Sequence, residues 1–473
     1  MPTAKRPPAV FLAALLAVVL RPAVAQGQTS RCQPLPSPPG GAISIAAGDA
    51  QALTEAVQRA IPGATILLAD GTYRMRWALI VRASGVTIRS ASGNARAVVL
   101  DGGYEANELV AIEASGVTVA HLTMTRAVDH LVHLVPAPQS SIRGIRLSGL
   151  RLVDAGEQFI KANPDAGRTA FVDDTTVECS EFELTDEGRG HVETLGGTSC
   201  YTGGVDVHAS RGWTVRFNRF EGLFCRTGFL SEHAVHFWQN ARDTVVENNL
   251  IVNCARGIGF GLGEGNPIAR RWDDVQAAGY VGHLGGVIRN NVIYADIPEY
   301  DTGIGLEQAR DVRVLHNTVF AGPGATKAFS SIDLRFASTL AMVHNNLVNK
   351  ITLRSGPTVT ATHNLEGASA ADFIDVGRLD FHLRAGSKAI DAGVVLDDGG
   401  VDIDGKPRGP QPDIGAYEKR ATGEFHPPPF EFGPGTWNPG TWNRGSRLVL
   451  AHSEAGDDRI GVVSEPQSVH AVR

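Results

Sequence analysis

A strand-forming motif repeats through the middle of this chain at a variable interval of about 30 residues. Each copy is an apolar, β-branched stretch followed by a small or amide residue and a second apolar stretch, as in SGVTVAHLTM, DTVVENNLIVN and VRVLHNTVFAG. Alternation at period two favours strands over helices. The variable interval excludes a propeller with fixed blades, and it predicts a solenoid whose coils share strands and differ in their loops.

An asparagine recurs at one position of the later repeats. The equivalent positions are Leu122, Leu150, Ser180, Asn218, Asn249, Asn291, Asn317, Asn346 and Asn364. At the same corner of stacked coils, a side-chain amide can bond to the coils above and below it and satisfy turn backbone that stacking buries. The sequence therefore predicts an asparagine ladder.

The two ends of the repeat region resemble a known group of proteins. PGATILLADGTY, SGVTIRSASGN and VVLDG, between residues 61 and 102, resemble the opening coils of bacterial right-handed parallel β-helix proteins, including polysaccharide lyases of the alginate and chondroitin type. FHLRAGSKAIDAG and DIDGKPRGPQPDIGAYE, between residues 380 and 418, resemble the C-terminal closing module of exported β-helix proteins. The resemblance implies an all-β fold, a single right-handed parallel β-helix over residues 42–418. Residues 51–60 would form a short helix that caps the first coil.

The segments outside the repeats differ in composition. Residues 1–25 carry Lys5 and Arg6, an apolar run and the small residues Ala23-Val24-Ala25, which is typical of a secretory signal peptide. We expect a secreted or periplasmic protein with no membrane span, because the apolar run is too short for one. Residues 26–41 are interpreted as a linker, and the Pro- and Gly-rich residues 421–473 as a disordered tail.

Charge and cysteine content constrain the partners and the covalent framework. The formal net charge of -7 argues against nucleic acid, whose binding needs a basic face. All five cysteines, Cys32, Cys179, Cys200, Cys225 and Cys254, lie in the part expected to be exported, where disulfides persist. Their spacing does not choose among the possible pairings, and buried thiols with a single bridge remain an alternative. We expect a monomer.

Titratable residues are densest between residues 203 and 266. Two wide departures from the repeat, residues 163–204 and 257–286, flank this cluster, and we expect them to be loops that cover a binding groove. His208 and His236 are separated by about one coil, as are Arg226 and Arg256, so neighbouring strands would bring each pair together. Trp213 and Trp238 are candidate platforms for sugar rings.

The resemblance to lyases implies β-elimination on a uronic-acid polymer, with a Lys and Arg pair transferring protons and calcium binding the carboxylate. Assigned by residue type, the base is Lys161, its pKa lowered by burial and by Arg226. His208 or His236 would donate the proton to the leaving oxygen. The remaining candidates are Arg256, Trp213 and Trp238 for substrate binding, and Asp206, Glu232 and Glu247 as oxygen ligands for calcium.

Other functions stay open at this point. An epimerase shares the elimination half of the lyase reaction. A hydrolase of the pectinase kind is disfavoured, because Asp173-Asp174 is the only matching part of its aspartate series. A non-catalytic surface or adhesion module that binds an acidic polysaccharide is the main alternative, since solenoids form extended binding faces. An enzyme should gather Lys161, His208, Arg226 and His236 at one place, whereas a binding module should scatter them.

Overall fold

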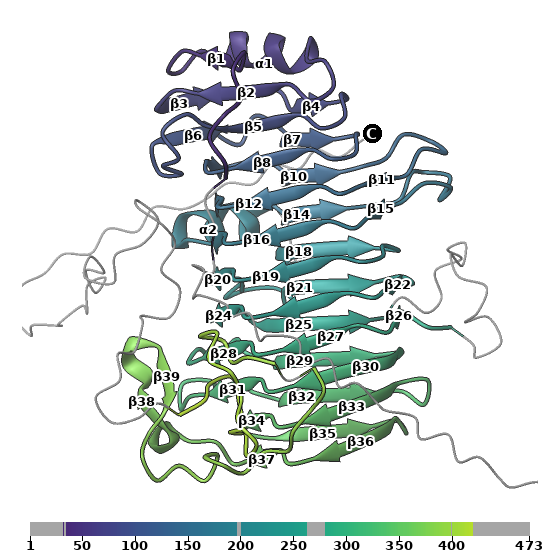
Figure 1. The fold of residues 1–473 in the computed structure, drawn as a ribbon, viewed down its shortest axis with the longest axis vertical. Coiled ribbons are helices and arrows are strands. Elements are labelled where there is room, and N and C mark those ends of the chain that lie inside the picture. Colours follow the sequence, from purple (N-terminus) through teal and green to yellow (C-terminus); the bar gives the residue numbers. More distant parts are fainter. Residues whose placement is uncertain (1–31, 33–34, 196–199, 263–279, 399, 420–473) are drawn as a thin grey trace, which may run out of the picture. The chain divides into compact units, whose positions relative to one another are not determined.

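The computed structural model describes residues 32, 35–195, 200–262, 280–398 and 400–419, and these form a right-handed parallel β-helix (Figure 1). Each coil adds one strand to each of three parallel sheets, as β12 (Arg146–Ser148), β13 (Arg151–Val153) and β14 (Gln158–Ala162) do. The predicted fold class is therefore confirmed. The expected signal peptide and tail lie outside the described residues, as does most of residues 26–34.

The three sheets follow the order of the coils. The first contains β1 (Ile43–Ile45), β2 (Thr65–Leu68), β5 (Thr87–Ser90), β8 (Thr118–Ala120), β12, β16 (Thr176–Glu178), β19 (Thr214–Arg216), β22 (Ala241–Arg242), β23 (Val245–Glu247), β26 (His283–Leu284), β27 (Val287–Arg289), β30 (Ala309–Leu315), β33 (Leu340–His344) and β36 (Thr358–Thr362). The second contains β3 (Gly71–Arg74), β6 (Val98–Asp101), β9 (Thr123–Thr125), β13, β17 (Glu181–Glu183), β20 (Arg219–Glu221), β24 (Leu250–Val252), β28 (Val292–Ala295), β31 (Thr318–Ala321), β34 (Leu347–Val348) and β37 (Leu365–Glu366). The third contains β4 (Leu79–Val81), β7 (Glu108–Ile112), β10 (His130–Leu134), β14, β18 (Gly203–His208), β21 (His233–Trp238), β25 (Arg256–Gly261), β29 (Thr302–Glu307), β32 (Ser330–Arg335) and β35 (Ile351–Arg354).

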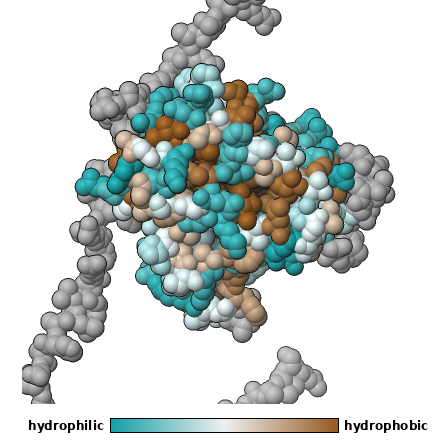
Figure 2. Space-filling view, turned by 90° about the horizontal axis from the view of Figure 1, so that it is seen from below, coloured by the Kyte–Doolittle hydropathy of each residue, from teal (hydrophilic) through white to brown (hydrophobic). Residues whose placement is uncertain are grey.

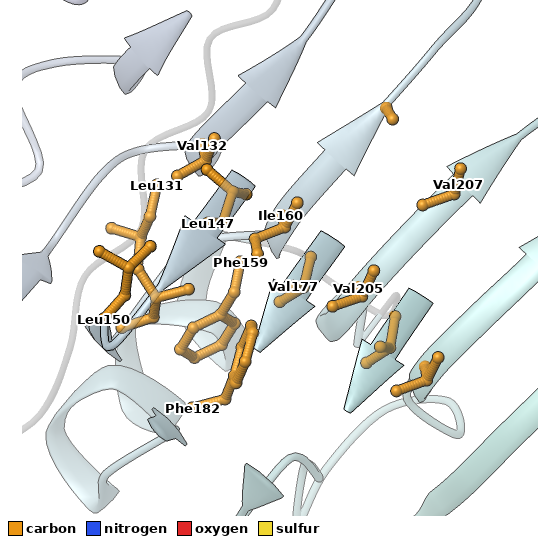
Figure 3. Packing of buried hydrophobic residues seen from close by; sticks show 14 of the residues in the cluster. Leu131, Val132, Leu147, Leu150, Phe159, Ile160, Val177, Phe182, Val205 and Val207 are labelled. Atoms are coloured by element: carbon orange, nitrogen blue, oxygen red, sulfur yellow. The ribbon is translucent and has the colours of Figure 1, made fainter. Parts of the chain in front are cut away.

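Inward side chains from the three sheets form one continuous core. Figure 3 shows part of it, where Phe159 of β14 and Phe182 of β17 approach each other among Leu, Ile and Val side chains from neighbouring strands. Their ring centroids are 6.1 Å apart, and Phe182 stacks on Phe220 of β20 at 4.3 Å. Burial of these apolar rows is the main favourable term that holds the coils together.

The predicted asparagine ladder is present. Asn249 donates from Nδ2 to Oδ1 of Asn291 at 3.0 Å, and Asn291 donates in the same way to Asn317 at 3.0 Å. Each Oδ1 also accepts the backbone N–H of the preceding rung, as in the bond from Asn249 N to Asn291 Oδ1. Ser180 joins the ladder through its N–H, which donates to Asn218 Oδ1 at 3.0 Å. The ladder thus satisfies backbone that stacking buries at this corner.

The first coil is capped by a helix. Helix α1 (Ala50–Gln58) nearly coincides with the expected residues 51–60, and Asp49 caps it by accepting the N–H of Ala52 at 2.9 Å. Its buried residues, Leu53 and Val57, pack on the core. At the other end, Figure 2 shows hydrophobic residues scattered among hydrophilic ones, and Leu353 of β35 is 54% exposed.

The closing segment differs from the prediction. The parallel coils end at Glu366, and residues 367–418 pack on the outside of the second sheet, so the β-helix is shorter than the expected range 42–418. The segment contains the antiparallel strands β38 (Phe373–Asp375) and β39 (Asp380–Leu383) and two 3₁₀ turns, η2 (Ala370–Asp372) and η3 (Val376–Arg378). Arg408 ties it to the coils by donating from Nη2 to Asn290 Oδ1 at 2.9 Å.

The expected loop over residues 163–204 is largely regular structure. It contains the short strand β15 (Val172–Asp173), which pairs with β11 (Ile142–Arg143), then β16 and β17, and then helix α2 (Asp186–Leu195). Strands β15 and β11 form a separate two-stranded sheet, and α2 lies between β17 and β18. The second expected loop, 257–286, begins in β25 and ends in β26 and β27, and residues 263–279 lie outside the described residues.

The structure contains two disulfides, Cys32–Cys179 and Cys200–Cys225. Cys254 is a buried free thiol. The second bridge joins the end of the α2 insertion to the segment that precedes β21. Among the described residues, no helix has the length and apolar character needed to cross a membrane.

Candidate functional site

Outward side chains of the third sheet carry the site. Figure 1 shows β10, β14, β18, β21 and β25 stacked one below another. Lys161, Asp206 and His236 are register partners on β14, β18 and β21, so they form one outward row. His208 and Trp238 pair in the next outward row. Alternation along the strands places these polar groups outside while their neighbours, such as Val205 and Val207, enter the core.

Lys161 and Asp206 form a buried ion pair at the centre of this face. The Lys161 ammonium donates to Asp206 Oδ2, and the Lys161 side chain is only 5% exposed. Asp206 Oδ1 accepts a hydrogen bond from Trp238 Nε1 at 2.7 Å. Burial alone would raise the pKa of Asp206, but the neighbouring His208, whose Nε2 lies 3.7 Å from Asp206 Oδ2, and the charge of Lys161 hold that pKa well below its usual range. Asp206 is therefore a carboxylate that orients its neighbours.

Lys161 lacks the lowered pKa that the sequence suggested for a base. Burial lowers its pKa, but the Asp206 carboxylate and the hydrogen bonds to Asp206 and Tyr201 outweigh burial, so the pKa is raised above its ordinary value. The predicted neighbour, Arg226, is absent from this group. At neutral pH Lys161 is a fixed ammonium, which suits it to binding a carboxylate or an enolate oxygen.

His208 and Tyr201 complete the group around Lys161. The Lys161 Nζ atom lies 3.3 Å from His208 Nε2 and 3.5 Å from the Tyr201 hydroxyl. Burial, together with Lys161 and His236, lowers the pKa of His208, although Asp206 opposes this shift, so the imidazole is neutral near pH 7. Burial raises the pKa of Tyr201, which keeps its hydroxyl protonated. A neutral base and a protonated acid thus flank one ammonium group.

Tyr201 was missed at the sequence level. It follows Cys200 directly, and the Cys200–Cys225 bridge fixes this point of the chain beside β18. The residue is 39% exposed, so it is the accessible member of the group. A cysteine next to an aromatic residue, at the end of a wide departure from the repeat, was the signal available in the sequence.

A second cluster lies at the start of β21. Glu232 Oε2 lies 3.6 Å from His236 Nδ1, 4.0 Å from His233 Nδ1 and 3.7 Å from Arg256 Nη2. The two imidazole rings lie 4.5 Å apart, and His236 stacks on Trp238 at 4.9 Å. Through Trp238, which donates to Asp206, this cluster adjoins the group around Lys161.

The positions of the predicted histidine and arginine pairs differ from expectation. The pairing of His208 with His236 was expected from their spacing; they lie on adjacent strands, but the register pairs His208 with Trp238 and His236 with Asp206. Arg226 lies between β20 and β21 and not on a strand of the third sheet, and it donates to Asp186 of α2 at 2.7 Å. Its expected partner, Arg256, pairs instead with His233.

Trp213 is a core residue, because its side chain is fully buried and packs against Phe237. It is not a sugar platform.

The expected calcium ligands do not converge. Asp206 is held by Lys161 and Trp238, whereas Glu247 belongs to β23 of the first sheet and accepts from Arg289 at 2.8 Å. Glu232 lies among imidazoles and a guanidinium. Calcium needs six to eight oxygen ligands around one point, and these three carboxylates cannot supply a common point because they belong to different groups.

Comparison with known proteins gives fold neighbours alone. No family model and no curated protein matches the chain. Among solved structures, the pectate lyase Pel9A is similar at 17% identity and a TM-score of 0.46, covering 78% of this chain and 90% of its own. An alginate lyase from Paenibacillus sp. str. FPU-7 is similar at 15% identity and 0.40, covering 68% and 99%. The surface adhesin PfbA of Streptococcus pneumoniae is similar at 10% and 0.38, covering 68% and 91%. At these values the likeness carries no argument about activity.

Proposed function

We propose that this protein is an exported polysaccharide lyase that cleaves a uronic-acid-containing polysaccharide by β-elimination. The observation that supports the proposal is the group of Lys161, Asp206, His208 and Tyr201 on one face of the third sheet. The Lys161 ammonium is a fixed cation. The neutral imidazole of His208 and the protonated hydroxyl of Tyr201 both lie within 3.5 Å of its Nζ atom. Those are the three elements that elimination beside a carboxylate requires.

The proposed reaction gives each group one role. The Lys161 ammonium neutralises the uronate carboxylate, so that the proton on the adjacent carbon becomes acidic, and Asp206 holds the ammonium in place. His208 accepts that proton, and the released electron pair forms the new carbon–carbon double bond. The bond to the leaving glycosidic oxygen breaks, and the Tyr201 hydroxyl protonates the oxygen. The proton on His208 then returns through solvent to the tyrosinate.

Acid and base must start in the correct protonation states for this scheme. Burial keeps the Tyr201 hydroxyl protonated, and burial with the Lys161 charge keeps His208 neutral. The ammonium replaces the calcium ion that the sequence resemblance suggested, since the carboxylates expected to bind calcium are separated. No step of the scheme uses a metal.

A panel of acidic polysaccharides tests the proposal. Purified protein is incubated with alginate, polygalacturonate, chondroitin and heparan-type polymers, and the ultraviolet absorbance of unsaturated uronate is followed. We expect absorbance to rise with one polymer class for wild type and for Arg226→Ala, whose side chain lies at α2, and to be lost in Lys161→Met. A polymer that is epimerised but not cleaved would show that the protein is an epimerase and not a lyase. Binding of a polymer without any reaction would favour the non-catalytic binding module.

A further inference from the structure

At the start of β21, the side chains of Glu232, His233 and His236 bring atoms that can ligate a metal close to one another. Glu232 Oε2 lies 3.6 Å from His236 Nδ1 and 4.0 Å from His233 Nδ1, and all three donor atoms lie within 4.8 Å. The backbone fixes Glu232 at this place, since its N–H donates to Thr202 O at 2.9 Å. Each ligand-type atom therefore comes from an anchored segment.

The proton on His236 determines what its ring offers to this cluster. His236 Nε2 lies 3.2 Å from Gly261 O, and a carbonyl oxygen only accepts, so Nε2 carries the hydrogen. In the neutral ring, Nδ1 then holds a lone pair that faces the Glu232 carboxylate. The His236 side chain is 4% exposed, and within the described part of the chain its Nδ1 has no hydrogen-bond partner. A buried lone pair facing a carboxylate is repulsive unless a cation lies between them.

His233 offers a second Nδ1 atom to this cluster. Its Nδ1 likewise lacks a hydrogen-bond partner among the residues that the structure describes. The ring lies flat over Gly259 of β25, where a Cβ atom would come within 2.7 Å of Nε2. Glycine at this outward position is what allows the ring to lean across to the next strand and aim Nδ1 at Glu232.

From this geometry we propose that Glu232, His233 and His236 bind a divalent metal ion of the zinc class. Bonds of 2.0 to 2.2 Å to imidazole nitrogen and carboxylate oxygen place two ligands about 3.4 Å apart across a tetrahedral angle. The observed 3.6 and 4.0 Å are close to that spacing. Two nitrogens and one oxygen favour zinc, cobalt or nickel over calcium, and three protein ligands leave a position open to solvent or to a ligand.

The surroundings match those of a metal site. The donation from His236 Nε2–H to Gly261 O is the kind of outer contact that orients a ligating imidazole. Arg256 donates from Nε to Ser231 O at 2.8 Å, and its Nη2 lies 3.7 Å from Glu232 Oε2, so it can support the carboxylate from the side. The competing occupant is a proton on His236 Nδ1, which would pair with Glu232 and leave no room for a metal.

This site is independent of the elimination scheme, which uses none of the three ligands. The test is a titration of untagged, chelator-stripped protein with Co²⁺, followed by visible absorbance, and with Zn²⁺, followed by calorimetry. The variants are Glu232→Gln, His236→Ala and Gly259→Ala. Glu307→Gln, on the same outward face at the end of β29, is the matched carboxylate control, and far-ultraviolet circular dichroism checks that each variant is folded.

We expect one ion per chain and the visible bands of nitrogen-ligated Co²⁺, with affinity unchanged in Glu307→Gln. Glu232→Gln and His236→Ala should weaken binding by about 100-fold or more, and Gly259→Ala, which only displaces a ligand, by about 10-fold. Wild-type protein that binds neither ion stoichiometrically would overturn the proposal, and this result depends on no variant. So would a folded Glu232→Gln variant that binds as tightly as wild type.

Discussion

Truncating a central rung of the asparagine ladder should destabilise the protein far more than truncating its last rung. Asn291 is fully buried, and its Oδ1 accepts from both the backbone N–H and Nδ2 of Asn249 at 3.0 Å. Its Nδ2 donates to Val246 O at 2.9 Å and to Asn317 Oδ1 at 3.0 Å. Asn291→Ala removes all four bonds.

The cost can be worked out group by group. Asn249 Nδ2 keeps two other acceptors, Val215 O and Glu247 O, so it stays satisfied. The buried N–H of Asn249 is orphaned, at about 1 to 3 kcal/mol, and the two lost donor bonds of Asn291 add about 1 kcal/mol each. We therefore expect a loss of about 3 to 5 kcal/mol. Asn364, the last rung, is only partly buried, so water can replace its bonds and Asn364→Ala should cost about 1 kcal/mol.

Urea denaturation followed by far-ultraviolet circular dichroism measures both variants, and hydrogen exchange at the Asn249 amide reports the local effect. Because a solenoid can unfold in segments, the unfolding free energies are compared only if the two variants have equal m-values. Equal destabilisation by Asn291→Ala and Asn364→Ala, to within about 0.5 kcal/mol, would refute the view that the ladder acts by satisfying buried backbone.

Two further predictions concern the closing segment and the disulfide beside the site. His382 is buried between Asp380 and Asp404, and although burial lowers its pKa, the hydrogen bonds to both carboxylates raise that pKa to about 9. His382 therefore contributes about 3 kcal/mol to folding stability below pH about 6.5, and this contribution is lost as the pH rises through about 9. In His382→Gln the melting temperature should depend less on pH between these values. A melting temperature that depends on pH as in wild type would count against the assignment. Opening the Cys200–Cys225 bridge by serine substitution of both residues frees the segment that carries Tyr201 and should lower elimination activity by about 10-fold or more, whereas Cys254→Ser should leave it unchanged.

The repeat predicted the coils and the ladder because each depends on local pattern. Period-two alternation specifies strands, and an asparagine repeated in phase specifies one corner. Helix α2 was not predicted because Gly188 and Gly190 weaken its helical pattern.

The site was predictable in part. Period-two alternation puts Asp206 on the same face as His208, and His236 on the same face as Trp238, and the register of β18 and β21 then pairs Asp206 with His236 and His208 with Trp238. It could not give the register between coils, since insertions change the spacing, and a shift of two residues decides whether His208 meets His236 or Trp238. The charge of Lys161 was also beyond the sequence, because it depends on whether its buried neighbour is Asp206 or Arg226.

The central claim is that His208 and Tyr201 perform the proton transfers on an acidic polysaccharide, and steady-state kinetics of His208→Ala and Tyr201→Phe on the polymer that wild type cleaves test it most directly. The account predicts that kcat falls by about 100-fold or more in each variant while KM changes little, because the Lys161 ammonium still binds the carboxylate. His363→Ala, an exposed histidine at the other end of the coils, should retain wild-type kinetics. Full kcat in both His208→Ala and Tyr201→Phe would contradict the account.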